Sequence, residues 1–180
     1  MTKLLVIDLD QTVIDSSIRE NACYPDGVLC LSKYHTVKTC PDNGIANDCL
    51  TPFGEWLKDN YISLSENGYE IAFLTARLCD YRDFDSFKVL GIDSMLLDRC
   101  LLIERGIASL YGGDSSEQDS GKYKKSIIWY LVNANFYDTS DITVIDDCQK
   151  VLSMAKEQGY NTVCARELYH YSEDDFTSLL

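Results

Sequence analysis

Two aspartates directly follow an apolar segment near the start of the chain. Residues 4–7 are four consecutive apolar residues, two of them β-branched, and they predict a buried strand that leads into Asp8 and Asp10. Because residues i and i+2 of a strand point to the same side, both carboxylates should lie together at its carboxyl end. Like charges at that separation require a cation or a shared proton. We therefore expect a magnesium site with acid–base chemistry beside it.

Polar groups also follow two later apolar segments, at residues 69–74 and 142–145, which predict two further buried strands. A lysine-rich segment that predicts the start of a helix lies between them. A lysine ammonium there could balance the charge of carboxylates and of a bound anion. The candidates from these three places are Thr75, Arg77, Lys122, Lys124, Lys125, Asp146 and Asp147.

The elements that must position these residues alternate between strands and helices. Predicted strands cover residues 4–7, 69–74, 95–97, 101–103, 142–145 and 162–164. Predicted helices begin at Pro52, with Thr51 as N-cap, and cover 82–90, 124–133 and the segment before Gly159. The apolar face of the helix at 124–133 is expected to include Trp129. This alternation predicts an α/β fold, a Rossmann-like parallel sheet flanked by helices. Such sheets bind ligands at the carboxyl ends of their strands.

The chain length of 180 residues predicts a single domain over residues 1–180. A polar, cysteine-bearing segment at about residues 15–50 is expected to form a flap or insertion over the strand ends. Four of the 8 cysteines lie there, but none of their spacings forms a C-x2-C pair. Free thiols are therefore favoured over a zinc site or disulfides for Cys23, Cys30, Cys40 and Cys49.

The composition is that of an ordinary soluble protein, with 46% apolar and 25% charged residues. Without a signal peptide or a membrane-length apolar run, we expect a cytoplasmic protein that does not bind membranes. The formal net charge of −13 argues against binding to extended duplex nucleic acid, which requires a basic surface. It leaves open the binding of a nucleotide or a phosphorylated strand end. No protein partner is predicted.

Four motifs in order resemble those of the haloacid dehalogenase superfamily of phosphotransferases: D-x-D-x-T at residues 8–12, then Thr75, a lysine and Asp146-Asp147. Together they span most of the chain. The resemblance implies a Mg²⁺-dependent phosphatase with an α/β core and no large cap, acting through an aspartyl-phosphate intermediate. The chain departs from many relatives at Gln11, where those relatives have Gly.

The same resemblance implies roles for individual residues. Asp8 would be the nucleophile, and Asp10 would protonate the leaving oxygen and then deprotonate the attacking water. Thr75 would donate a hydrogen bond to a phosphoryl oxygen, and a lysine would balance charge. Lys124 is favoured for that lysine, with Lys125 and Lys122 as the alternatives.

The resemblance also implies how metal and substrate would be held. Magnesium would be bound by the Asp8 carboxylate, the Asp10 backbone carbonyl and the pair Asp146 and Asp147. Of that pair, Asp147 is favoured as the direct ligand and Asp146 as a supporting group. Thr12, which ends the first motif, is assigned to substrate binding.

A closer resemblance is to the 3′-phosphatase domain of bacteriophage polynucleotide kinase-phosphatases. Arg19 lies nine residues after Asp10, Lys124 precedes Trp129 by five, and both Thr75-Ala76-Arg77 and Ile145-Asp146-Asp147 match motifs of that domain. No kinase P-loop is found. The resemblance implies that Arg19 and Arg77 clamp the phosphate or terminal nucleotide. It implies removal of 3′-phosphates from nucleic-acid ends, as in repair.

Two alternatives remain open at the level of sequence. The acidic charge favours a small-molecule phosphatase, such as a 5′-nucleotidase. An alternative of another class is a catalytically silent relative that binds a nucleotide or a protein partner. The complete set of motif residues argues against this second alternative.

Overall fold

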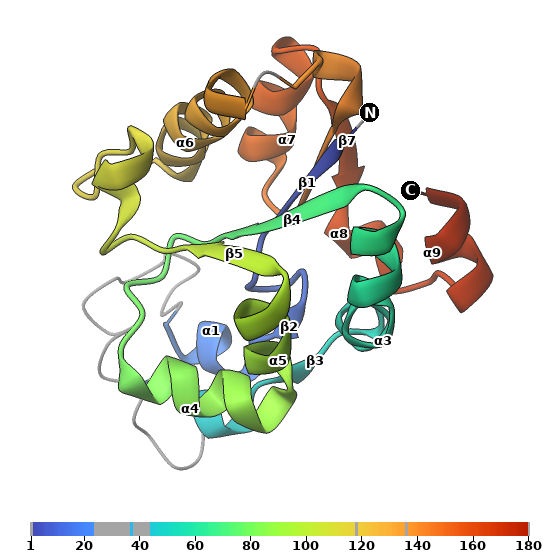
Figure 1. Ribbon diagram of the computed structural model, residues 1–180. Helices are drawn as coiled ribbons and strands as arrows, with labels where there is room; N and C mark the ends of the chain where they lie inside the picture. The colour runs from blue at the N-terminus through green and yellow to red at the C-terminus, as the bar shows by residue number, and fades with distance from the viewer. Residues whose placement is uncertain (1, 24–36, 38–43, 118, 136, 180) are drawn as a thin grey trace.

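A five-stranded parallel sheet with the order β5-β4-β1-β6-β7 forms the centre of the protein (Figure 1). The computed structural model describes residues 2–23, 37, 44–117, 119–135 and 137–179. The fold class predicted from the sequence is confirmed. The strands are β1 (Lys3–Ile7), β4 (Tyr69–Leu74), β5 (Cys100–Ile103), β6 (Ile142–Asp146) and β7 (Asn161–Cys164).

Helices cover both faces of the sheet, with α6 and α7 above it and α3, α4 and α5 below it in the view of Figure 1. Leu5 and Ile7 of β1 pack into the lower cluster, whereas Leu4 and Val6 pack into the upper one. Because both faces are covered, the strand is apolar throughout. The helices are α1 (Ser17–Cys23), α3 (Pro52–Glu66), α4 (Tyr81–Leu90), α5 (Ile92–Asp98), α6 (Ser120–Asn135), α7 (Gln149–Glu157), α8 (Ala165–Leu168) and α9 (Glu173–Leu179).

The start of helix α3 contacts and stabilises the loop that follows β1. Its predicted N-cap is confirmed, because the Thr51 hydroxyl accepts the backbone N–H of Gly54 at 2.9 Å. The same hydroxyl donates to the Thr12 carbonyl oxygen at 2.6 Å. A Cβ at Gly54 would lie 2.2 Å from the Val13 carbonyl oxygen, and only glycine permits this close approach. The loop that carries the first motif is therefore held against the helix start.

The ends of the segment between β1 and α3 are paired with each other. β2 (Ile14–Asp15) and β3 (Cys49–Leu50) form a two-stranded antiparallel sheet at its base. Its other described parts are α1 and a short 3₁₀ turn, Ile45–Asn47. Cys49 is a free thiol, whereas Cys30 and Cys40 lie outside the described residues.

Two expectations about local structure are wrong. The strand predicted at residues 95–97 is part of α5, which starts directly after Gly91. Gly91 has a φ of 78°, and this left-handed conformation lets the chain end α4 and turn at once into a second helix. Trp129, expected on the apolar face of its helix, is 57% exposed.

Among the described residues, no helix combines the length and the apolar character needed to cross a membrane.

The strand order reverses direction at β1. From β1 the chain passes to β4 and β5 on one side, and then returns to β6 and β7 on the other. Crevices at such reversals, outside the carboxyl ends of the strands, are where open α/β sheets bind ligands. Asp8 follows β1 and Asp146 ends β6, which places both carboxylates at this crevice.

Candidate active site

A buried lysine joins the ends of β1 and β6. The Lys124 ammonium lies 2.7 Å from Asp8 Oδ1 and 2.7 Å from Asp146 Oδ2, and the lysine side chain is only 4% exposed. Lys122 and Lys125 are exposed. The structure therefore brings Lys124, and neither alternative lysine, into contact with the expected nucleophile.

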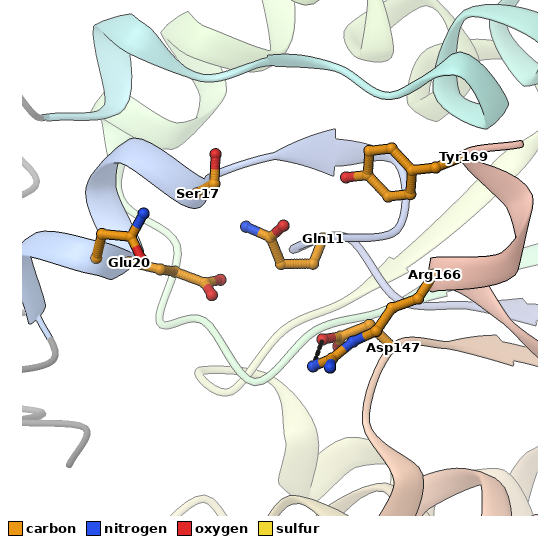
Figure 2. Close-up of a pocket in the computed structure, with 7 residues that line it drawn as sticks. Gln11, Ser17, Glu20, Asp147, Arg166 and Tyr169 are labelled. Carbon is orange, nitrogen blue, oxygen red and sulfur yellow. Dashed lines mark hydrogen bonds and ion pairs between the residues drawn. The ribbon is translucent and has the colours of Figure 1, made fainter. Parts of the chain in front are cut away.

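Three carboxylates at this crevice could hold a cation together. Asp8, Asp146 and Asp147 each offer an oxygen, and these atoms all lie within 4.8 Å of one another. Asp146 also accepts the Cys148 backbone N–H at 2.8 Å, which fixes its orientation. Asp147 faces an exposed arginine, Arg166, at 3.3 Å (Figure 2). Three carboxylates against one buried ammonium leave an excess of negative charge on oxygen donors, which fits Mg²⁺.

The electrostatics of this cluster favour a bound cation. Burial raises the pKa of Asp8 well above its ordinary value. The Lys124 charge opposes this rise, and the charges of Asp146 and Asp10 add to it. Burial and the Asp146 charge also raise the pKa of Asp147. Burial lowers the pKa of Lys124, but Asp146 and Asp8 outweigh it and keep the ammonium charged. A divalent cation would relieve the repulsion among the carboxylates.

Magnesium should therefore stabilise the protein, and Asp147→Asn should weaken that effect. At saturating Mg²⁺ we expect the melting temperature to rise by about 5 °C, because the ion binds only the folded chain. The rise should shrink at least about twofold in Asp147→Asn and stay unchanged in Asp59→Asn, which alters an exposed residue of α3. Differential scanning fluorimetry with and without chelator measures both. An undiminished magnesium shift in Asp147→Asn would exclude Asp147 as a ligand.

Asp10 lies in a network of buried arginines. Arg77 Nε donates to Asp10 Oδ2 at 2.7 Å, and Arg19 Nη2 donates to Asp10 Oδ1 at 2.9 Å. Both guanidinium groups also reach Asp48 Oδ2, at 3.3 Å from Arg77 and 2.9 Å from Arg19. Arg77 further contacts Asp83 of α4 at 3.3 Å. Both arginines predicted to bind substrate thus contact the expected acid–base residue.

This network holds Asp10 in its ionised form. Burial raises the pKa of the Asp10 carboxyl, but Arg77 and Arg19 outweigh burial and hold this pKa well below its usual range. An ionised carboxylate can accept a proton from water. To donate a proton to a leaving oxygen, Asp10 would need the arginine contacts to loosen.

Asp48 and Asp83 belong to this network and were missed by the sequence analysis. Asp48 lies in the cysteine-bearing segment, which was treated as a flap, and Asp83 lies inside a predicted helix. Nothing in the sequence around either residue distinguishes it from an aspartate exposed to solvent. Burial raises the pKa of Asp48 despite the two arginines, which reflects how little water reaches it.

Replacing Asp48 by asparagine should destabilise the protein. The change leaves two buried guanidinium groups with less negative charge around them, and such losses cost about 3 kcal/mol. Urea unfolding at neutral pH measures this cost, with the exposed Asp59→Asn as the matched control. Equal unfolding free energies for the two variants would mean that Asp48 contributes nothing through its charge.

The two threonines assigned to the site are fully buried. Thr75 Oγ1 accepts the Arg77 backbone N–H at 3.1 Å, and the Thr75 carbonyl accepts the Tyr123 hydroxyl at 3.2 Å. The Thr12 carbonyl accepts the Thr51 hydroxyl, and Thr12 Oγ1 has no hydrogen-bond partner among the described residues. Thr75 is thus held at the end of β4 beside the arginine network, and Thr12 anchors the first motif.

Glu20 of α1 is a further acidic residue near the carboxylate cluster. Ser16 Oγ donates to Glu20 Oε1 at 2.9 Å, and Gln11 Nε2 donates to Ser16 Oγ at 3.2 Å. Burial and the charge of Asp10 raise the pKa of Glu20 to about 7. The sequence analysis did not identify Glu20.

The chain is similar to known proteins over most of its length. The family model described as bacteriophage T5 5′-deoxynucleotidase matches residues 1–172. The 5′-deoxynucleotidase of Escherichia phage T5 is 24% identical over 170 residues, which are 92% of this chain and 68% of that protein.

Solved structures show the same fold. A haloacid dehalogenase-like hydrolase from Streptococcus pneumoniae has a TM-score of 0.61 at 14% identity, covering 98% of this chain and 97% of that one. CbbY from Rhodobacter sphaeroides in complex with phosphate has a TM-score of 0.58 at 11% identity, covering 91% and 86%. The chain therefore belongs to the bacteriophage T5 5′-deoxynucleotidase family, and it shares its fold with a haloacid dehalogenase-like hydrolase.

Proposed function

We propose that the protein is a Mg²⁺-dependent phosphomonoesterase that releases phosphate from deoxynucleoside 5′-monophosphates. The observation that carries this proposal is the contact of Asp8 with Lys124 inside a carboxylate cluster at the sheet crevice. In this arrangement Asp8 can act as a nucleophile beside a fixed positive charge and beside carboxylates that can bind magnesium. The family match supports a nucleotide as the substrate.

In the first step, Asp8 attacks phosphorus. A bond forms between its free carboxylate oxygen and phosphorus, and the bond from phosphorus to the ester oxygen breaks. That oxygen takes its proton from the protonated form of Asp10 and leaves as an alcohol, and Asp10 is then ionised for the second step. Lys124 balances the negative charge that gathers on the phosphoryl oxygens, and the Thr75 hydroxyl can donate to one of them. Bound Mg²⁺, held by Asp8, the Asp10 backbone carbonyl, Asp146 and Asp147, would supply further positive charge there.

In the second step, water restores the enzyme. The ionised Asp10 carboxylate takes a proton from water, whose oxygen attacks the aspartyl-phosphate and returns Asp8 as a free carboxylate. Arg77 and Arg19 act on this step by orienting Asp10 and stabilising its charged form. We assign the two arginines to this positioning role, because their guanidinium groups are buried against carboxylates.

An assay can test directly which phosphate group of the substrate, 5′ or 3′, the protein removes. Phosphate release with magnesium is measured on deoxynucleoside 5′-monophosphates, ribonucleoside 5′-monophosphates, deoxynucleoside 3′-monophosphates, and oligonucleotides phosphorylated at either end. Asp8→Asn protein is the blank for contaminating phosphatase. We expect the highest kcat/KM for the deoxynucleoside 5′-monophosphates.

Other outcomes of this assay are equally informative. The removal of 3′-phosphate from nucleic-acid ends, implied by the resemblance to a 3′-phosphatase domain, stays a prediction. A strong preference for the 3′-phosphorylated oligonucleotide would establish that activity and overturn the proposal. A protein that binds magnesium and hydrolyses none of these esters would support the catalytically silent alternative.

A further inference from the structure

A pocket of about 520 Å³ opens beside the carboxylate cluster, between α1 and α8 (Figure 2). This volume is in the range of sites that bind small molecules. The pocket lies outside the carboxyl ends of β1 and β6, where the sheet order reverses. Its lining consists of Gln11, Ser17, Glu20, Asn21, Asp147, Arg166 and Tyr169.

The pocket adjoins the reacting atoms. Asp147 belongs both to its lining and to the carboxylate cluster that contains Asp8, and Gln11 directly follows Asp10. A phosphate ester whose phosphorus lies at Asp8 must direct its alcohol portion away from the cluster. The pocket offers that portion a place in direct continuity with the phosphate position.

Gln11 holds an unusual backbone conformation at the edge of this pocket. Its φ is 56°, in the left-handed region that favours glycine, and it has the only positive φ among the described non-glycine residues. Its side chain is fixed by donation to Ser16 Oγ at 3.2 Å, which in turn donates to Glu20. A strained residue at a ligand site indicates that its side chain serves a purpose which glycine could not.

Tyr169 supplies the aromatic surface of the pocket. The residue is 36% exposed, and Figure 2 shows its ring directed toward the space between Gln11 and Ser17. The other lining side chains are polar or charged. A flat ring opposite amide and carboxyl groups suits a ligand that has one stacking face and a hydrogen-bonding edge, as a nucleobase has.

We propose that this pocket is the nucleoside subsite, in which the base stacks on Tyr169 and the Gln11 amide hydrogen-bonds the sugar or base. The inference rests on the proposed function and specifies the part of the substrate that each residue contacts. Among the described residues that line the pocket, Arg166 is the one cationic side chain, and Asp147 already pairs with it at 3.3 Å. The lining therefore offers no unpaired cation to the next phosphodiester of a strand. The subsite therefore selects mononucleotides over polymer ends.

Two substitutions test the subsite. Tyr169→Leu removes the ring, and Gln11→Gly removes the amide while giving the left-handed position its preferred residue. For deoxynucleoside 5′-monophosphates we expect KM to rise about tenfold in either variant, with kcat changed less than about threefold. With glycerol phosphate, which has no base, kcat/KM should stay within about twofold of the unmodified protein. Tyr169→Phe keeps the ring and should restore the low KM.

Controls separate recognition from folding. Tyr130→Leu removes another part-exposed tyrosine, on α6, and should leave KM for nucleotides unchanged. The melting temperature of Gln11→Gly should equal or exceed that of the unmodified protein, because glycine relieves the strained φ. Calorimetric titration of the four deoxynucleoside 5′-monophosphates into Asp8→Asn protein, with and without Tyr169→Leu, gives the affinity loss without turnover.

The outcomes distinguish this inference from the proposed function. If the protein hydrolyses deoxynucleotides but Tyr169→Leu and Gln11→Gly leave KM and affinity unchanged, the subsite is wrong and the activity stands. If both variants lose activity equally on nucleotides and glycerol phosphate, the residues act on the reacting centre, and the subsite is again wrong. If the unmodified protein hydrolyses no nucleotide, the proposed function fails, and the subsite fails with it.

Discussion

Asp8→Asn should lower kcat/KM for phosphate release by about 10⁴-fold or more while leaving the fold intact. An amide nitrogen and its neutral carbonyl oxygen cannot attack phosphorus, and the neighbouring carboxylate of Asp10 is held by Arg19 and Arg77. The substitution nearly preserves side-chain volume in a buried position. It removes one of the two ion pairs of Lys124 but also the repulsion with Asp146, and Lys124 keeps its pair with Asp146 at 2.7 Å. The free energy of unfolding without magnesium should therefore stay within about 1 kcal/mol of the unmodified protein.

The matched control is Asp85→Asn, which makes the same chemical change on the exposed side of α4. It should retain full activity and stability. Initial rates with a deoxynucleoside 5′-monophosphate, together with urea unfolding curves, measure both effects. Residual activity in Asp8→Asn within tenfold of the unmodified protein would remove Asp8 from the nucleophile's role and require another group to attack phosphorus.

The sequence predicted the sheet because its signals are local. Three of the six predicted strands lead directly into polar motif residues, and their apolar runs reflect burial on both faces. The strand prediction was wrong for residues 95–97. An apolar run this short has no periodicity that distinguishes a strand from a buried helix. In α5, Ile92 and Met95 are buried at helical spacing while Leu97 is 82% exposed.

Helical spacing could have selected among the lysines. Lys124 precedes the buried Ile127 and Ile128 by three and four residues, which places all three on one face of α6. Lys122 and Lys125 do not share that face. The same reasoning turns Trp129 outward, since it lies one position beyond the buried pair.

The arginine network could not be predicted in this way. Arg19, Arg77 and Asp48 come from α1, the end of β4 and the segment before α3, and only the folded chain brings them together. The resemblance to a 3′-phosphatase domain identified both arginines as functional. That they face Asp10 depends on burial, which no local pattern encodes.

Lys124→Met should produce the second large effect, a loss of about 10³-fold in kcat/KM together with a stability that depends on magnesium. Removing the ammonium leaves Asp8 and Asp146 without their shared partner at 2.7 Å. Without magnesium, the free energy of unfolding should fall by about 3–5 kcal/mol, since a buried ion pair has lost one member. Saturating magnesium should recover part of this loss by neutralising the same carboxylates.

Lys122→Met and Lys125→Met are the matched controls, because they remove the same charge from exposed positions on the same helix. Both should retain activity, and neither should change the magnesium-induced shift in melting temperature. The combination of lost activity and an enlarged magnesium shift separates Lys124 from a purely structural lysine, which would lose stability to the same extent with or without the ion. Activity lost in Lys122→Met or Lys125→Met and retained in Lys124→Met would mean that the buried ammonium is not the group that balances phosphoryl charge.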